Sequence, residues 1–449
     1  MPPEGGHAAR CGRLLAALAA GDAGAPLGLA KATSNLFRDR KATPKHRLDL
    51  GEFTHVLGID GAAGTADVEG LASYEALVAA TLPHGVMPAV VPQLKTITVG
   101  GAAAGVGIEA TSFRHGLVHH TMRELEVLLP GGEIVVCTPT NEHADLFHGF
   151  PNSYGTLGYA LRLVLATQPV LPFVRVVHER HGGAASFFAA LAARCDDRQV
   201  DFVDGVTFDA GTLVLNTATF ADEAPWTSDY GYEHIYWRSL REREVDWLRA
   251  ADYLWRWDTD WFWCSRNFGA ERPWLRRLLG RERLNSRTYT KLMRWNARWG
   301  FTRRWARLRG AHPESVIQDV DIPLEHAAEF LAFLLREVGI TPVWICPLRE
   351  PGAGEAFPLY PLRGGRLYVN FGFWDVVESR SARPPGHYNR LVEHEVARLG
   401  GIKSLYSDSF FTPEEFAAAY RLPAYEALKA RYDPQRRLLG LYDKCVLRA

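Results

Sequence analysis

Apolar and polar positions alternate over short stretches in the first third of the chain. Residues 56–70 contain two such stretches around a glycine-rich turn and are predicted as two strands, followed by a helix over residues 73–80. Residues 125–129 and 133–137 are further apolar stretches, and the Pro-Gly-Gly sequence between them is typical of a β-hairpin. Strands this short, with few long helices, favour an α+β domain over a doubly wound parallel sheet.

Helical periodicity is clearest in the C-terminal half. Apolar residues line one face of a predicted helix over residues 321–339, which has Pro323 near its start and Gly339 at its end. Thr412 and Glu415 have the spacing of a capping box, in which each side chain accepts a hydrogen bond from the backbone N–H of the other residue. We therefore predict that a further helix begins at Thr412.

Residues 98–107 hold a run of glycine and alanine. Glycine has no Cβ atom, so its backbone can approach a diphosphate closely and direct several N–H groups at it. Residues 105–110 also match the loose G-x-G-x-x-A fingerprint of dinucleotide-binding folds, although the long apolar helix that this fingerprint requires does not follow. A tight turn would explain one or two of the five glycines between Gly100 and Gly116, but not all of them. The run therefore predicts a cofactor loop, in either a Rossmann or a flavin-binding fold.

Gly155 and Gly158 lie in a second segment of this kind, residues 152–159. Taken alone, such a segment is more often a turn that enters a strand than a ligand site. Paired with the first run, it would bring backbone against a flat ring system.

Nine short segments together form a pattern that is more specific than either glycine run. They are residues 92–101, 107–116, 145–147, 155–158, 343–347, 367–369, 405–408, 414–416 and 442–444. The pattern resembles the FAD-binding domain (PCMH type) of the vanillyl-alcohol-oxidase superfamily, and within that superfamily it is most similar to the delta-24-sterol reductase (Diminuto) family. The resemblance covers nearly the whole chain, and residues 226–309 are its most divergent part.

The resemblance implies an α+β protein in three parts. Residues 1–170 are expected to form the FAD-binding PCMH-type domain, with two subdomains. Residues 171–400 are expected to form an α+β substrate (cap) domain with an antiparallel sheet. Residues 401–449 are expected to form a C-terminal segment that returns towards the flavin domain.

The resemblance also implies a set of residues around FAD. Thr98 through Ser112 would wrap the pyrophosphate, and Gly155 to Gly158 would lie near the flavin. The implied cofactor-binding residues are Thr98, Val99, Gly100, Gly101, Gly105, Gly107, Ile108, Glu109, Ser112, Gly116, Gly155, Thr156, Leu157 and Gly158. Residues 33–38 contain no Gly-Gly-His element of the kind that attaches flavin covalently. We therefore expect non-covalent FAD, with NADPH as the source of electrons.

Reduction of an isolated carbon–carbon double bond, the reaction of that family, needs a hydride donor on one side and an acid on the other. Reduced flavin would supply the hydride. A tyrosine or a protonated carboxylic acid suits the second role at neutral pH. The candidate catalytic residues on the C-terminal segments of the resemblance are Tyr406, Asp408, Tyr442 and Lys444. Tyr406 would equally serve as a packing residue, and Asp408 as a cap of a turn.

Tryptophan and arginine are concentrated in the middle of the chain. Eleven of the 13 tryptophans lie between Trp226 and Trp305, and residues 266–309 carry 13 arginines and one lysine against two glutamates. One interpretation is that residues 226–309 dock on an anionic membrane, because Trp and Arg favour the headgroup region. In a second, four tryptophans wall a large apolar substrate pocket and the arginines are solvated or bind the NADPH phosphate. Those four are Trp255, Trp257, Trp261 and Trp263.

Composition narrows the class of protein further. The net charge is zero, so the molecule as a whole has no attraction for nucleic acid, and the flavin motifs argue against a nucleic-acid role for the Trp/Arg-rich residues. The six cysteines and 16 histidines show no metal-ligand spacing, so no metal is expected. No stretch approaches the roughly 20 apolar residues that span a bilayer. We expect a cytoplasmic protein with peripheral contact at the inner face of the membrane.

The predicted function is therefore reduction of a double bond in a bulky apolar lipid. The lipid is either a sterol with an unsaturated side chain or a phospholipid with a methylene-bearing fatty acyl chain. The alternatives are an alcohol oxidase or dehydrogenase of the same superfamily, and a lipid-binding protein with a vestigial flavin fold.

Overall fold

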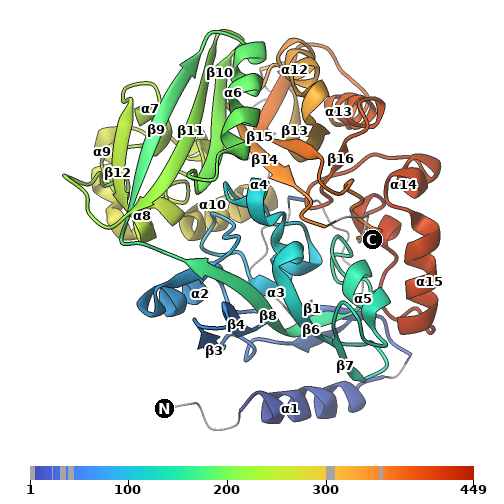
Figure 1. Cartoon of the computed structure of the whole chain (residues 1–449). Coiled ribbons are helices and arrows are strands. Elements are labelled where there is room, and N and C mark those ends of the chain that lie inside the picture. Colours follow the sequence, from blue (N-terminus) through green and yellow to red (C-terminus); the bar gives the residue numbers. More distant parts are fainter. Residues whose placement is uncertain are drawn as a thin grey trace.

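Two large antiparallel sheets lie one above the other in the molecule (Figure 1). The structure, a computed structural model, describes residues 6–22, 24–30, 37–38, 45–299, 309–352 and 357–448. Residues 33–36 of the segment tested above for covalent flavin attachment, and Trp305, lie outside these ranges. The antiparallel sheets with packed helices confirm the predicted α+β class.

The first sheet has six strands, in the order β3-β4-β8-β6-β7 with β5 paired to β8. Their bounds are β3 Val56–Asp60, β4 Thr65–Glu69, β5 Val86–Pro88, β6 Met122–Leu128, β7 Ile134–Cys137 and β8 Tyr159–Pro169. The predicted hairpin is confirmed, since β6 and β7 pair antiparallel. A separate parallel pair is formed by β1 (Leu27–Ala30) and β2 (His46–Asp49).

Short helices surround this sheet. Their bounds are α1 His7–Ala19, α2 Tyr74–Thr81, α3 Val99–Ala104, α4 Ser112–His115 and α5 Ala144–Gly149. The predicted helix over residues 73–80 is α2, and the Ser73 side chain caps it by accepting from the Ala76 N–H. Helix α1 lies beneath the sheet in Figure 1 and buries Leu14 and Leu18 against Tyr159 and Leu161 of β8.

The second sheet has eight antiparallel strands, in the order β12-β9-β11-β10-β14-β15-β13-β16. Their bounds are β9 Phe173–His181, β10 Phe202–Asp209, β11 Thr212–Ala221, β12 Val245–Arg249, β13 His312–Pro323, β14 Val343–Arg349, β15 Leu367–Ser379 and β16 Ile402–Lys403. Helices α6 (Ala184–Asp196), α12 (Leu324–Phe333) and α13 (His387–Arg398) cover its outer face (Figure 1). Because side chains alternate along a strand, Val320 points into that helical layer while its neighbours Asp319 and Asp321 point towards Val106, Ile108 and Leu117.

The predicted helix over residues 321–339 begins later than expected. Asp321 and Pro323 belong to β13, where they pair with Asn370 and Tyr368 of β15, and the α-helix starts only at Leu324. The sheet pairing prevails over the local proline signal at this point. The helix ends as a π-helical turn, Leu334–Val338, and Gly339 stops it with a φ of 72°.

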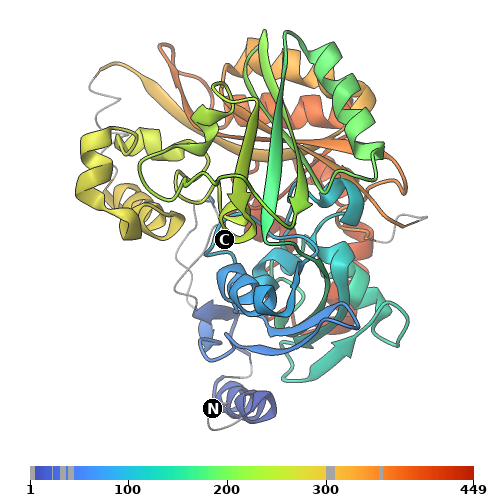
Figure 2. The same cartoon turned by 60° about the vertical axis from the view of Figure 1, so that its left-hand side comes forward.

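The middle of the chain and its C-terminus complete the fold. The remaining α-helices are α7 Tyr236–Ser239, α8 Ala250–Leu254, α9 Pro273–Leu279, α10 Ser286–Trp299, α14 Pro413–Ala419, α15 Leu422–Tyr432 and α16 Leu441–Cys445. Short 3₁₀ helices lie at Leu82–His84, Val118–Thr121, Cys264–Phe268 and Arg281–Arg283. The capping box predicted at Thr412 is confirmed. Figure 2 shows α9 and α10, in yellow, as a helical unit at one edge of the molecule.

Two further features concern the cysteines and the helices. All six cysteines are free thiols. Within the described ranges, no helix combines the length and the apolar character needed to cross a bilayer.

Candidate active site

The first glycine run folds into a short helix rather than an open loop. Thr98 is the N-cap of α3, and the Gly100 N–H donates to the carbonyl of Gly70 at 2.8 Å. A Cβ on Gly100 would lie 2.7 Å from that carbonyl oxygen, and a Cβ on Gly107 would lie 2.6 Å from Val118 Cγ2. Close packing against protein atoms therefore requires these two glycines.

The second glycine segment lies directly on the end of the first. The Tyr154 N–H donates to the Ala104 carbonyl at 2.8 Å, and the Asn152 N–H donates to the Gly105 carbonyl at 3.2 Å. Gly158 has a φ of 153°, and a Cβ there would lie 2.5 Å from Val127 Cγ1. The two segments that the sequence singled out thus form one continuous surface.

The remaining residues of the first run divide between the core and that surface. Val99 and Ser112 are buried, and Gly116 turns the chain with a φ of 71° beside His120. Gly101 is exposed. Ile108 lines a cavity that is described below.

Glu109 is linked to the second sheet through an ion pair with Arg256. Its carboxylate lies 3.4 Å from the Arg256 guanidinium, which also pairs with Asp204 of β10 at 2.8 Å, and all three side chains are buried. Burial is the main cause that raises the pKa of Glu109 to about 7. The backbone N–H of Glu109 donates to the Ser112 hydroxyl at 3.0 Å. This network ties the glycine run to the second sheet.

The C-terminal segment holds the second glycine segment by its backbone. The Lys444 ammonium donates to the Tyr154 carbonyl at 2.6 Å, and the Lys429 ammonium donates to the Thr156 carbonyl at 2.7 Å. Lys429 is itself buried and paired with Asp433 at 2.6 Å. Leu157, between these contacts, is fully buried.

A small cavity of about 20 Å³ lies where the glycine run faces the second sheet. The residues around it are Val106, Ile108, Leu117, Asp319, Asp321, Tyr360, Asn370 and Ser404. The run contributes an apolar wall and the sheet contributes a wall with two carboxyl groups. Asp321 is held by the Tyr360 hydroxyl and the Asn370 amide, each at 2.7 Å, and burial raises its pKa to about 6.

Asp319 contributes the other carboxyl group of this wall and lies next to Tyr406. The Asp319 carboxyl group neighbours the Tyr406 hydroxyl, and its Oδ1 atom is buried without a hydrogen-bond partner. The Trp374 indole N–H donates to the same hydroxyl at 2.7 Å. Burial raises the pKa of Asp319 to about 7 and that of Tyr406 well above its usual range. Asp319, Trp374 and Tyr406 each keep partly accessible surface.

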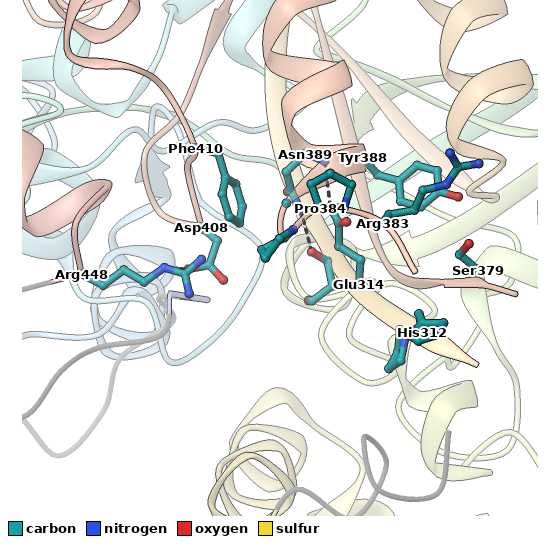
Figure 3. Close-up of a pocket in the computed structure, with 14 residues that line it drawn as sticks. His312, Glu314, Ser379, Arg383, Pro384, Tyr388, Asn389, Asp408, Phe410 and Arg448 are labelled. Carbon is teal, nitrogen blue, oxygen red and sulfur yellow. Dashed lines mark hydrogen bonds and ion pairs between the residues drawn. The ribbon is translucent and has the colours of Figure 1, made fainter. Parts of the chain in front are cut away.

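The four candidate catalytic residues separate in space. Tyr406 neighbours Asp319, which lines the cavity, and Lys444 reaches the second glycine segment. Asp408 lies in a different, polar pocket of about 220 Å³, 3.4 Å from Arg448 (Figure 3). The Tyr442 hydroxyl donates to the Phe411 carbonyl at 3.2 Å. Tyr406 is therefore the member of the set that neighbours the acidic wall of the cavity.

Sequence reasoning missed Asp319, Trp374 and the Arg256–Asp204 pair. The signal for Asp319 was an alternation, Asp319-Val320-Asp321, that places two acids on one face of a strand. Sequence alone did not show that this face is covered by the glycine run.

The residues around the two glycine segments fit a large polar ligand such as FAD. Several residues in this part of the described chain carry a buried side-chain nitrogen or oxygen atom without a hydrogen-bond partner, namely Gln93, Asn152, Ser153, Asp319, Asn370 and Ser407. Buried polar groups are normally satisfied, and a dinucleotide offers both donors and acceptors.

The tryptophans of the middle segment divide into two groups. Trp257 and Trp263 are fully buried in the main core, so they do not wall an open pocket as the second interpretation had it, because they pack on one another and on Phe262. Trp261 is also buried and stacks on Tyr289. Trp255 is partly accessible. The exposed members are Trp226, Trp274 and Trp295.

Comparison with known proteins agrees with this geometry and confirms the resemblance stated above. Residues 15–138 match the family described as FAD binding domain. The chain is 28% identical to Delta(24)-sterol reductase of Arabidopsis thaliana over 444 residues, which cover 90% of this chain and 77% of that protein. It is 26% identical to the human Delta(24)-sterol reductase over 425 residues, 89% of this chain and 77% of that protein. Similarity to cytokinin dehydrogenase 7 of rice, 30% identity, is confined to 32% of this chain and 28% of that protein.

Proposed function

Because this chain carries an FAD-binding domain and is similar along most of its length to Delta(24)-sterol reductases, we propose that it is an FAD-dependent oxidoreductase that reduces a carbon–carbon double bond of a lipid. The lipid is a sterol with an unsaturated side chain or a phospholipid with a methylene-bearing acyl chain. FAD is bound non-covalently, and NADPH supplies the electrons. The proposed division of the chain is a flavin domain (1–170), a substrate domain (171–400) and a C-terminal segment (401–449).

One observation carries this proposal: the glycine run and the carboxyl group of Asp319, which neighbours Tyr406, line the same cavity from opposite sides. Bound FAD, once reduced, supplies a hydride. Residues 98–112 and 155–158 hold the cofactor, and the apolar side chains of Val106 and Ile108 keep water from the reacting carbons. Tyr406 donates the proton that completes the reduction.

The test is reduction of the purified protein by NADPH without oxygen, followed by addition of each lipid. We expect yellow protein that NADPH bleaches and that a lipid with an isolated double bond turns yellow again, with a product two mass units heavier. Lipid mass spectrometry of cells with and without the gene should show accumulation of the unsaturated species. Rapid reoxidation by air, with alcohols as the only reductants, would favour an oxidase. Colourless protein that binds lipid would favour the non-enzymatic alternative.

We further propose that helices α9 and α10 dock the protein on the inner, anionic face of a membrane. The exposed apolar side chains on these helices are Trp274, Leu278, Leu292 and Trp295, with 61%, 70%, 40% and 57% of their surface accessible. Exposed basic residues lie among them, at Arg272, Arg277, Arg281, Arg283, Arg287 and Lys291. Apolar side chains that insert at the headgroup level, surrounded by cations, fit an anionic bilayer, and each cation contributes about 1 kcal/mol near such a surface.

Co-sedimentation with vesicles tests this surface. The protein should bind vesicles containing phosphatidylserine at low salt, bind less at high salt, and bind neutral vesicles weakly. Changing Trp274 and Trp295 together to alanine should reduce binding at least tenfold. The matched control is Leu57→Ala, which removes an exposed apolar side chain from β3, a strand distant in sequence from α9 and α10. Equal binding of the two variants would exclude α9 and α10 as the docking surface.

A further inference from the structure

The hydroxyl group of Tyr406 has one hydrogen-bond partner and one acidic neighbour, which together restrict where its proton can point. The Trp374 indole can only donate, so it occupies one lone pair of the phenol oxygen, at 2.7 Å. The Asp319 carboxyl group is the acidic neighbour, and its buried Oδ1 atom has no hydrogen-bond partner. The phenol ring is fixed by an edge-on contact with Phe37, with 5.8 Å between ring centroids.

The protonation state of Asp319 decides the direction of any hydrogen bond that forms between this carboxyl group and the Tyr406 hydroxyl. An ionised carboxylate only accepts, so it draws the Tyr406 proton towards itself. A protonated carboxylic acid donates instead and occupies the second lone pair of the phenol oxygen. With both lone pairs occupied, the Tyr406 O–H has no acceptor among these two residues, and it is left to point into the site.

We propose that Asp319, in its protonated form, is the positioning residue that turns the Tyr406 O–H towards the substrate and then restores its proton. The inference rests on the function proposed above. Reduced flavin delivers a hydride to one alkene carbon, and the O–H bond of Tyr406 breaks as a C–H bond forms at the other carbon. The Asp319 O–H then transfers its proton to the phenolate oxygen, and solvent reprotonates Asp319 before the next cycle. One hydride and one proton are consumed for each double bond reduced.

The surroundings of Asp319 favour the protonated form near neutral pH. Asp321 lies two residues away on the same face of β13 and contributes like charge, and Tyr154 of the second glycine segment faces the same space. Among the arginines and lysines of the described ranges, none forms an ion pair with Asp319. Burial in this environment raises its pKa to about 7. Below that pH the group holds the proton that the arrangement requires.

Three variants of the FAD-loaded protein test this assignment. The measurement is the rate at which lipid reoxidises the NADPH-reduced flavin in a single turnover, across pH 5.5 to 9, with the lipid class that the wild-type protein reduces. The wild-type rate should fall about tenfold per pH unit above pH 7. Asp319→Asn keeps an N–H donor for the phenol oxygen, so it should keep at least a tenth of the rate at pH 6 and lose the decline above pH 7. Asp319→Leu offers no donor and should lose about 100-fold or more at every pH.

Asp321→Asn is the matched control, because it changes the neighbouring acid of the same cavity wall. Whatever its effect on the rate, it should retain the decline above pH 7. A second measurement needs no turnover: the infrared carbonyl band of a protonated carboxyl group should titrate near pH 7 in the protein with oxidised FAD and be absent in Asp319→Asn. A pH profile of Asp319→Asn that matches the wild type overturns the assignment. Absence of any lipid reduction by the wild type would overturn the proposed function instead, and the infrared titration would still decide whether Asp319 holds a proton.

Discussion

The indole N–H of Trp374 donates a hydrogen bond of 2.7 Å to the hydroxyl of Tyr406, although the two residues belong to different parts of the chain. Trp374 lies on β15, a long central strand, while Tyr406 lies in the segment after β16 at the edge of the sheet. The rigid strand thereby fixes the position of a side chain that its own segment would leave less constrained.

Removal of this hydroxyl should lower turnover without releasing the cofactor. Tyr406→Phe keeps the ring and its contact with Phe37 but removes the acid, so turnover should fall about 100-fold or more. The ratio of flavin to protein absorbance should stay that of the wild type. Trp374→Phe removes the indole N–H, and a smaller ring replaces the indole, but the Tyr406 hydroxyl stays, so the cost should be less, about tenfold. Unchanged turnover in Tyr406→Phe would remove it from the chemistry.

Substitution of Gly158 should destabilise the fold before it affects cofactor affinity. The φ of 153° is strained for any L side chain, and an added Cβ would meet Val127 at 2.5 Å and the Leu128 carbonyl oxygen at 2.8 Å. Gly158→Ala should therefore cost about 1–3 kcal/mol of the free energy of unfolding, measured by denaturant titration. At Gly131 an added Cβ has no atom within 4 Å, so Gly131→Ala is the control and should have little effect. Similar losses in both variants would contradict this packing argument.

Loss of Arg256 should be among the most damaging changes outside the cavity. Arg256→Met leaves Glu109 and Asp204 buried without their counter-charge, which typically costs about 3–5 kcal/mol. Arg277 pairs with Glu233 at the surface, so Arg277→Met should cost less than about 1 kcal/mol. Thermal unfolding of the two variants measures the difference. Equal melting temperatures would show that the buried network contributes little.

Helix α1 should make stability depend on alkaline pH. Hydrogen bonds to Glu126 and Glu69 raise the pKa of His7 to about 9 in the folded protein, above its usual value of 6.5. The stabilising contribution of His7 is therefore complete below pH 6.5 and is lost as pH rises through about 9. The free energy of unfolding, measured from pH 6 to pH 10, should decline over that interval, and the decline should be smaller in His7→Gln. Identical pH profiles of the two proteins would contradict this.

Local signals in the sequence predicted the elements that depend on neighbouring residues. The β6–β7 hairpin and the capping box at Thr412 and Glu415 were predicted correctly, since turn chemistry and cap spacing operate within a few residues. The start of α12 was wrong because the pairing of Asp321 with Asn370 on another strand keeps three residues in β13. No local pattern contains that information.

The candidate site was predicted in part for the same reason. Each glycine segment is a single continuous stretch of sequence, so its glycines could be recognised without knowledge of the fold. Asp319 and Tyr406 are distant in sequence and meet only through the order β15-β13-β16 in the sheet. The proximity of these two residues depends on the sheet topology. The sequence alone therefore indicated Tyr406 as a candidate but not Asp319 as its neighbour.

The two lysine contacts on the second glycine segment also govern when the protein can mature during synthesis. Lys429 and Lys444 bind carbonyls that lie 273 and 290 residues earlier in the chain. At translation rates of roughly 5–20 residues per second, Lys444 is synthesised about 15–60 s after the Tyr154 carbonyl to which it donates. A ribosome therefore exposes the second glycine segment long before the two lysines that bind its carbonyls have been made. Completion of this segment is thus expected to follow synthesis of Lys444 rather than accompany synthesis of the segment itself.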